Sequence, residues 1–390
     1  MKDNIEYDKL IVWLFHQFPA FQKIGAKAYK PTLENTWKLI DLFALDLDKL
    51  KFIHVAGTNG KGTTCSILAS VLQESNYTTG LFTSPHIHDF RERIKVNGEM
   101  IDREKVRSFI EEVKSIEWEI KPSFFEITWV LALKHFIESH CDIVVVETGL
   151  GGRLDATNVI SPIVSVITNI GLDHTSILGN SKPEIAREKA GIIKNSTPVF
   201  VGEKVSETEP IFSEVAASSS SPILFLDEVE QSVFEQNKRL AFLVLDYLSK
   251  NGWNISTEDY LSGVKNLYRN TGLKGRLQVL KENPLIIADA AHNKEGISAL
   301  VDHLKRSYPN KDIHVVYGAS NDKGLEDILP LFPTNWSYYF TSFKNVRSFA
   351  KLELIKKTAS LTAKKDFFDS SKKAFKKAQL SLDKNGMIVV

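Results

Sequence analysis

A glycine-rich loop with a single lysine constrains the fold of this chain more than any other segment. The run HVAGTNGKGTT occupies 54–64, after the short apolar stretch Phe52–Ala56 and at the start of a helix-like run, Thr63–Gln73. A strand, a glycine-rich loop and a helix in this order form a phosphate cradle, because backbone N–H groups and the helix dipole face the anion. Lys61 is expected to reach the outer phosphates, and a hydroxyl just after it to bind Mg2+.

The loop departs from the usual phosphate-binding sequence motif at one position, since Gly62 separates the lysine from the hydroxyls. A glycine-rich turn without a ligand is the alternative, but strand, lysine and helix are all in place. The residues expected to hold the nucleotide are Gly57, Thr58, Asn59, Gly60, Lys61, Gly62, Thr63 and Thr64.

The bulk composition excludes several classes of protein. The 390 residues suggest two domains, and a net charge of +1 gives no broad field for nucleic acid or a membrane surface. The two cysteines, Cys65 and Cys141, lack metal-ligand spacing and are expected to be reduced and buried. The N-terminus has no signal-peptide layout, and no apolar run reaches the roughly 18 residues of a membrane span. A cytoplasmic protein is expected.

Short apolar runs alternate with longer amphipathic runs along the chain, which predicts βαβ units and a mostly parallel sheet. The strands are predicted at Phe52–Ala56, Ile143–Glu147, Val164–Ile170, Val199–Val201, Ile223–Leu226, Leu285–Asp289 and Ile313–Tyr317. The helices are predicted at Arg103–Lys114, Glu126–Ser139, Lys182–Ile193, Ser232–Lys250 and Lys294–Ser307. The polar, glycine-containing segment Tyr268–Arg276 breaks the pattern and is interpreted as a hinge between a larger and a smaller domain.

Polar residues follow the predicted strands at the edge where parallel sheets bind ligands. Glu147 ends one strand, Asp173 and His174 follow the next, and Lys189 lies on a later helix. With a hydroxyl of the glycine-rich loop, Glu147 and His174 form a donor set that suits Mg2+. A lysine beside a cation makes sense if Lys189 contacts phosphate or is carbamylated. For each residue taken alone, the alternative is a structural role: a helix cap for Glu147, a core position for His174 and a surface charge for Lys189.

Two further regions carry candidate ligand contacts. The loop at 81–98 holds Ser84, Pro85, His86 and Arg91 and is interpreted as a substrate loop, with a plain surface loop as the alternative. In PSFFEITW, spacing alone favours a core role for the paired phenylalanines 124 and 125 over a ring-binding site. In the C-terminal part, a strand ends at Asp289, His292 begins the next helix, and Arg276 follows the hinge. Gly318, Asp322 and Lys323 are a further candidate nucleotide contact.

Together these segments resemble the folylpolyglutamate synthase/dihydrofolate synthase family of the Mur-ligase-like enzymes. The motifs HVAGTNGKGT, FTSPHI, FFEIT, ETGLGGRLDATN, GLDHTSILG, EKAGIIK, GR at Gly275–Arg276 and DAAHNKEG occur in the family order and spacing, from about residue 30 to 325. The resemblance implies an α/β protein: a P-loop parallel-sheet ATP-binding domain with a folate or pterin site at 1–270, and a smaller Rossmann-like glutamate ligase domain at 271–390. ATP is expected between them.

The resemblance also implies functional residues at matching positions. Two Mg2+ sites would use Thr63, Ser84, Glu147, His174 and carbamylated Lys189. Phe125 and Asp155 would line a pterin pocket, with Ser84, Pro85, His86 and Arg91 also on the substrate side. Arg276 and Asp289 would contact ATP, and His292 the glutamate side; Lys61, Glu147, His174 and Lys189 would be catalytic.

Two departures from the family pattern stand out. The chain ends at the strand-like run NGMIVV, where the family usually continues into a Gly-Ser loop and another strand; the departure bears on the glutamate end of the site, and a native end and a truncated one are both open. Thr63 replaces the family's usual serine after GKG, which keeps the hydroxyl.

The resemblance implies an ATP-dependent ligase that joins L-glutamate to dihydropteroate, to the γ-glutamyl end of a reduced folate, or to both. The alternatives are a monofunctional folylpolyglutamate synthase, a Mur-type peptide ligase and a nucleotide-dependent switch. A Mur-type ligase would carry about a hundred residues before the loop, whereas only 56 precede Gly57. A nucleic-acid role is supported only by the lysine-rich stretch Lys372–Gln379, and a solvated helix face is the simpler interpretation of that stretch. A monomer is expected.

Overall fold

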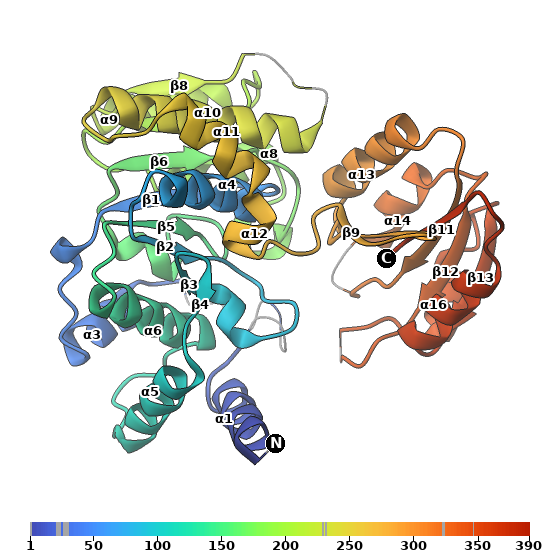
Figure 1. The fold of residues 1–390 in the computed structure, drawn as a ribbon, viewed down its shortest axis with the longest axis horizontal. Helices are drawn as coiled ribbons and strands as arrows, with labels where there is room; N and C mark the ends of the chain where they lie inside the picture. Colours follow the sequence, from blue (N-terminus) through green and yellow to red (C-terminus); the bar gives the residue numbers. More distant parts are fainter. Residues whose placement is uncertain are drawn as a thin grey trace. The chain divides into compact units, whose positions relative to one another are not determined.

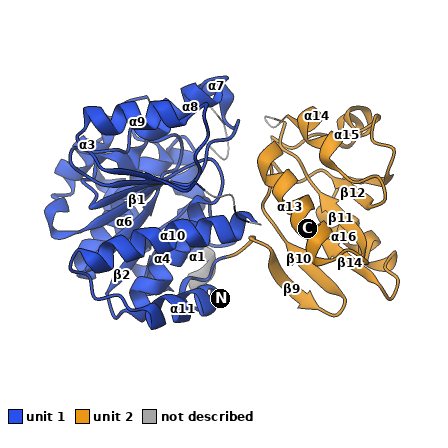
Figure 2. Ribbon diagram, turned by 90° about the horizontal axis from the view of Figure 1, so that it is seen from above, with its two compact units in different colours: residues 1–273 blue, residues 274–390 orange. Residues whose placement is uncertain are grey.

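The computed structural model describes residues 2–20, 25, 31–227, 230, 232–321, 324–345 and 347–390. Within them the chain forms two compact units, Met1–Leu273 and Lys274–Val390, which Figure 2 shows in blue and orange. Each unit has its own sheet and its own hydrophobic core. The expected Asp322 and Lys323 contacts lie outside the described residues.

The sheet of the first unit has the strand order β4-β3-β2-β5-β1-β6-β7-β8. Strands β2, β5, β1, β6, β7 and β8 run parallel, while β3 and β4 form an antiparallel edge. The predicted, mostly parallel sheet is therefore confirmed. The strands are β1 (Phe52–Ala56), β2 (Thr79–Phe82), β3 (Ile94–Val96), β4 (Glu99–Met100), β5 (Ile143–Glu147), β6 (Val164–Ile167), β7 (Val199–Val201) and β8 (Ile223–Phe225).

Helices cover both faces of this sheet, so the central strands β1 and β5 are buried along their whole length. One face packs against α1 (Lys2–Gln17), α3 (Glu34–Leu42), α5 (Arg103–Ser115) and α6 (Phe124–Glu138). The other face packs against α4 (Lys61–Glu74), α10 (Val233–Lys250) and α11 (Thr257–Lys265) (Figure 1). Residues of α7 (Thr175–Leu178), α8 (Lys182–Ala190) and α9 (Glu209–Ser218) form a further cluster with the ends of β6 and β7.

The second unit repeats the design on a smaller scale, with the strand order β13-β12-β11-β14-β10-β9. All neighbours are parallel except the edge strand β9. Its strands are β9 (Gln278–Glu282), β10 (Leu285–Ala288), β11 (Asp312–Tyr317), β12 (Ser337–Thr341), β13 (Lys364–Phe368) and β14 (Gly386–Val389). Its helices are α13 (Lys294–Ser307), α14 (Leu325–Ile328), α15 (Lys351–Lys357) and α16 (Ser371–Leu380).

Several predicted boundaries are wrong for identifiable reasons. The strand predicted to reach Ile170 ends at Ile167, because the next residues bind the glycine-rich loop instead of a neighbouring strand. The helix predicted to reach Ile193 ends at Ala190, where Gly191 caps it. The polar segment interpreted as a hinge begins inside a short helix, α12 (Leu267–Thr271), which ends at Gly272 in a left-handed conformation.

Candidate active site

The glycine-rich loop joins β1 to α4, and two of its glycines have no room for a side chain. Gly57 has φ 148°, and a Cβ atom there would lie 1.8 Å from Thr168 Oγ1. Gly60, which caps α4, has φ 82°, and its Cβ would lie 2.4 Å from Asn237 Oδ1. Left-handed backbone and crowded surroundings together require glycine at both positions. The loop therefore holds its backbone where only glycine fits, at a helix N-terminus that can receive an anion.

The segment after β6 fixes the shape of this loop. The Thr58 N–H donates to the Asn169 carbonyl at 3.0 Å, and the Asn59 N–H donates to Asn169 Oδ1 at 2.9 Å. Thr168 Oγ1 donates to the Asn59 carbonyl at 2.6 Å. The N–H groups of Thr58 and Asn59 thus shape the loop in this structure. The amides at the start of α4, which have no acceptor within the helix, are the ones left to face a phosphate.

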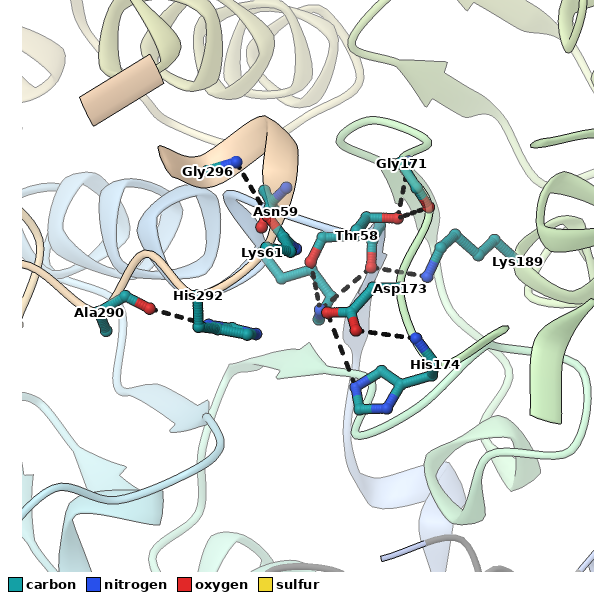
Figure 3. A network of polar contacts seen from close by, with 12 residues as sticks. Thr58, Asn59, Lys61, Gly171, Asp173, His174, Lys189, Ala290, His292 and Gly296 are labelled. Carbon is teal, nitrogen blue, oxygen red and sulfur yellow. Dashed lines mark hydrogen bonds and ion pairs between the residues drawn. The ribbon is translucent and has the colours of Figure 1, made fainter. Parts of the chain in front are cut away.

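Two lysine ammonium groups meet at one carbonyl of the loop (Figure 3). Lys61 Nζ donates to the Gly57 carbonyl at 3.0 Å, and Lys189 Nζ donates to the same oxygen at 2.7 Å. Lys189 is 3% exposed, and this burial, together with repulsion from Lys61, lowers its pKa to about 7. Attraction from Asp173 and Asp155 opposes the shift. A substantial fraction of Lys189 is therefore an uncharged, nucleophilic amine at neutral pH.

Glu147 ends β5 against the start of α4. It is 4% exposed, and its Oε2 accepts the Ser84 N–H at 3.0 Å. The same oxygen lies 3.4 Å from the position that a Cβ of Gly62 would take. Thr63, in the first turn of α4, is also 4% exposed. The structure thus places Glu147 next to Ser84 and the start of α4.

His174 stands at the N-terminus of α7 with φ 52°, a left-handed conformation that is uncommon for a residue with a side chain. Its N–H donates to Asp173 Oδ1 at 2.8 Å, and its Nε2 lies 3.9 Å from Asp173 Oδ2. Figure 3 shows the side chains of Asp173, His174, Lys61 and Lys189 pointing toward one region beside the loop. The role of His174 in a site with the glycine-rich loop stays a prediction.

The substrate loop contains one arginine that the sequence analysis missed. Arg91, the residue chosen there, forms an ion pair with Asp89 at 2.8 Å and lies over the Tyr7 ring. Arg93 instead points inward: it is 1% exposed, and its Nε donates to His86 Nδ1 at 2.7 Å. Burial lowers the pKa of Arg93 to about 10, and the charge of Glu147 opposes this. No sequence signal separates the two arginines, because both belong to one short 3-10 helix, Phe90–Arg93, and only its packing decides which side chain is buried.

Burial and the adjacent cation also lower the pKa of the histidine in this loop. The pKa of His86 is lowered to about 4, mainly by burial and secondly by Arg93. His86 is therefore neutral at pH 7, with Nδ1 accepting from the guanidinium and Nε2 carrying the proton. Pro85, between Ser84 and His86, follows a cis peptide bond and is exposed.

Phe125 and Asp155 meet at one turn after β5. A Cβ at Gly149 would lie 2.6 Å from Phe125 Cζ, so the half-buried ring covers this glycine. Asp155 is 4% exposed and accepts the Leu150 N–H at 2.7 Å and the Thr157 hydroxyl at 2.5 Å. Burial raises the pKa of Asp155, whereas these hydrogen bonds lower it, and the effect of burial is the larger one. In this structure Asp155 organises the turn that supports Phe125.

The predicted residues of the second unit gather where β10 ends. Asp289 accepts the N–H groups of Leu277 and Ala291 at 2.8 and 2.9 Å. Arg276 Nη1 donates to the Gly275 carbonyl at 3.0 Å, and His292 Nδ1 lies 2.8 Å from the Ala290 carbonyl. Asp289 thus ties together the segments that carry the other two predicted residues.

The described residues contain no group of three aspartate, glutamate, histidine or cysteine side chains that could hold a metal ion. The predicted donor set includes only two such side chains, Glu147 and His174, and otherwise relies on the hydroxyls of Thr63 and Ser84 and on a modified Lys189. Carboxylate, hydroxyl and imidazole donors beside a phosphate loop fit Mg2+. Among the described helices, none is long and apolar enough to span a bilayer.

Comparison with known proteins gives matches in both units. The Mur ligase middle domain family matches residues 55–239, and the Mur ligase glutamate ligase domain family matches residues 275–390. The dihydrofolate synthase/folylpolyglutamate synthase of Bacillus subtilis is 35% identical over 80% of this chain and 81% of the relative. The folylpolyglutamate synthase of Lacticaseibacillus casei is 30% identical over 82% of this chain and 81% of its own length.

Solved structures agree with these matches. Escherichia coli FolC in complex with DHPP and ADP has a TM-score of 0.83 and 28% identity, covering 98% of this chain and 94% of that one. A bifunctional folylpolyglutamate synthase/dihydrofolate synthase with Mn, AMPPNP and L-glutamate bound has a TM-score of 0.82 and 29% identity, with 98% and 94% covered. The expected Mur-ligase-like α/β fold is thereby confirmed. The chain belongs to the dihydrofolate synthase/folylpolyglutamate synthase family of ATP-dependent ligases.

Proposed function

We propose that this chain joins L-glutamate to dihydropteroate and also to the γ-glutamyl end of reduced folates, with release of ADP and phosphate. The observation that carries the proposal is the cluster at the glycine-rich loop, where Lys61 and Lys189 share the Gly57 carbonyl and Glu147 faces the start of α4. That cluster suits phosphoryl transfer from ATP. The similar structures that hold ADP, or AMPPNP with L-glutamate, support the same chemistry.

The reaction proceeds in two steps. The acceptor carboxylate attacks the γ-phosphorus of ATP, which forms an acyl phosphate and releases ADP. The amine of L-glutamate then attacks the acyl carbon, phosphate leaves, and the nitrogen loses a proton as the amide forms. Phosphorylation comes first because a free carboxylate is a poor electrophile. Lys61 and the N–H groups at the start of α4 offset the charge on the transferring phosphoryl group.

We assign two Mg2+ sites to the donors Thr63, Ser84, Glu147, His174 and carbamylated Lys189. When bound, Mg2+ would offset negative charge on the phosphate oxygens and help orient them. The Mn in a similar structure supports the use of a divalent ion. The buried Lys189 amine supports carbamylation, because only the uncharged amine reacts with CO2 and burial lowers its pKa to about 7. Wild-type activity should fall in CO2-depleted buffer and return with bicarbonate; activity indifferent to both would count against the carbamate.

We place the acceptor ring beside Phe125 and the Gly149 turn, with Asp155, Ser84, Pro85, His86 and Arg91 as further residues on that side. In the second unit, Arg276 and Asp289 serve ATP and His292 serves glutamate. A bifunctional enzyme is the form we favour, and a monofunctional folylpolyglutamate synthase is the alternative, since relatives of both kinds are similar to this chain. We further propose a monomer.

The test is ADP release with ATP, Mg2+ and L-glutamate, with 7,8-dihydropteroate or a reduced folate as the acceptor. Turnover with both acceptors is expected, and turnover with only one would establish a monofunctional ligase. ADP release that is independent of glutamate and of both acceptors would contradict the proposal and favour a nucleotide-dependent switch. Light scattering of the purified chain tests the monomer.

A further inference from the structure

A fully buried histidine lies in the middle of β1, three residues before the glycine-rich loop begins at Gly57. His54 is 0% exposed, and burial lowers its pKa to about 3, so the ring is neutral. Its Nε2 lies 2.8 Å from Thr157 Oγ1. Its Nδ1 is buried and has no hydrogen-bond partner among the described residues. A buried polar atom without a partner costs free energy, and the hydrogen bond of Nε2 offsets part of that cost.

The partners of Thr157 decide where the protons lie. The Thr157 hydroxyl has one proton and lies 2.5 Å from Asp155 Oδ1, which also accepts the Thr157 N–H at 3.0 Å. Backbone N–H groups of Leu150 and Gly149 donate to the same carboxyl group. Because this carboxyl group already accepts the backbone N–H groups, we take it as the acceptor of the Thr157 hydroxyl proton as well. His54 must then donate its own Nε2–H to the hydroxyl oxygen, which leaves a bare lone pair on Nδ1.

The result is a directed chain of hydrogen bonds from β1 to the acceptor side of the site. His54 donates to Thr157, Thr157 donates to Asp155, and Asp155 accepts from the turn at Gly149 and Leu150. The ring of Phe125 lies against that turn. Among the described residues, the His54 ring has a hydrogen bond to Thr157 and none to a group assigned above to ATP, glutamate or the acceptor ring. Its influence on the site therefore passes through the turn.

We propose that His54 is a positioning residue for the acceptor: through Thr157 and Asp155 it holds the turn at Gly149 where Phe125 can contact the ring of dihydropteroate. The inference rests on the proposed function and deepens it. The glycine-rich loop does not depend on this chain, because the β1 backbone pairs with β5 and β6 and the segment after β6 binds the loop separately. Loss of the His54 donor should therefore weaken acceptor binding and spare ATP.

Steady-state kinetics of ADP release in three variants tests whether acceptor binding weakens while ATP binding is unchanged. His54→Leu removes the donor, Thr157→Val removes the hydroxyl with little change in shape, and His54→Gln keeps an N–H near the position of Nε2. We expect KM for dihydropteroate to rise about tenfold in the first two variants, the effect of losing one buried hydrogen bond. KM for ATP and for L-glutamate should change less than about twofold, and His54→Gln should restore most of the acceptor affinity.

The effects of His54→Leu and Thr157→Val on KM for dihydropteroate should not add, because both variants break the same chain of hydrogen bonds. The double variant is expected to resemble either single variant. Should His54→Leu fail to fold, Thr157→Val still carries the measurement. An unchanged KM for dihydropteroate, or an equal rise of KM for all three substrates, would overturn the proposal.

His314→Leu is the matched control. His314 is 2% exposed in the second unit and has hydrogen bonds to Tyr339 and Asp312 at 2.9 and 2.8 Å. Its loss removes comparable buried hydrogen bonds that have no link to Asp155. We expect His314→Leu to lower the melting temperature and to leave KM for dihydropteroate unchanged; a rise as large as that of His54→Leu would show a general loss of stability instead.

A second measurement separates this inference from the proposed function. Nitrogen-15 NMR of the labelled histidines reports which ring nitrogen of His54 carries the proton, with His54→Gln providing the assignment. A proton on Nε2 supports the chain even if the wild-type protein shows no turnover with dihydropteroate, and a proton on Nδ1 reverses its direction and overturns it. Wild-type inactivity with both acceptors would contradict the proposed function alone.

Discussion

Replacing Lys189 with methionine should stabilise the protein while abolishing its activity. The pKa of Lys189 is about 7 in the folded protein, against an ordinary value of 10.5. Between these two values the unfolded chain holds a proton that the folded chain has released, so stability rises with pH across this window. Below about pH 7 both states are protonated, and the cost of burying the charge is complete. Each pKa unit corresponds to about 1.4 kcal/mol, which gives a cost of roughly 4 kcal/mol at pH 7.

Methionine fills a similar volume and carries no charge, so it removes that cost. The Gly57 carbonyl keeps a partner in the variant, because Lys61 also donates to it at 3.0 Å. We expect Lys189→Met to be about 4 kcal/mol more stable at pH 7 and only about 1 kcal/mol more stable at pH 10. Because the first unit spans Met1–Leu273, each kcal/mol shifts its melting temperature by somewhat less than about 2 °C, so the melting temperature at pH 7 should rise by about 7 °C.

The assay is thermal and urea unfolding at pH 7, 8.5 and 10 in CO2-depleted buffer, in which Lys189 is the free amine. Lys265→Met is the control, since Lys265 is exposed on α11 and its replacement should change stability by no more than about 0.5 kcal/mol. A Lys189→Met variant that is less stable than the wild type at pH 7 would refute the reasoning. So would a difference in stability that is the same at all three pH values.

Three further substitutions test other parts of the site. Lys61→Ala should abolish ADP release while circular dichroism and the melting temperature stay close to those of the wild type; normal turnover would contradict the role of the glycine-rich loop. Gly57→Ala should weaken ATP binding by at least about tenfold in calorimetry, because its Cβ would clash with Thr168 Oγ1 at 1.8 Å. Gly252→Ala is its control, since Gly252 also has a positive φ but nothing within 4 Å; equal effects would point to backbone strain alone. Phe125→Ala should raise KM for dihydropteroate about tenfold and leave KM for ATP unchanged, and the reverse pattern would remove Phe125 from the acceptor site.

Local sequence was sufficient for the elements whose determinants are contiguous. The buried strands at β1 and β5 are short apolar runs, and the glycine-rich loop carries its strand, its lysine and its helix within about twenty residues. The motifs there also predicted that Glu147, His174 and Lys189 belong to one site, because the carboxyl ends of parallel strands share an edge. Both cysteines were predicted to be buried, and both are.

Boundaries were less predictable where a tertiary contact competes with the local pattern. The strand was predicted to reach Ile170, yet β6 ends at Ile167 because the Asn169 carbonyl and side chain accept the N–H groups of Thr58 and Asn59. The start of α12 could not be seen either, since polar residues and glycines obscure a helix of five residues. Helix α6 begins two residues earlier than predicted because Ser123 and Glu126 form a capping box.

What the sequence by itself determined is therefore the order of elements and the strand, loop and helix around Lys61, and it also proposed the residues of the site. Only the tertiary structure decided which of those residues are buried and which partners they meet. Arg91 and Arg93 have the same spacing pattern, and packing against His86 and Phe124 selects Arg93 as the buried one. His54 meets Thr157 across 103 positions, and Lys189 meets Gly57 across 132. Such contacts depend on how distant segments pack, and burial then determines which groups lose or keep their charge.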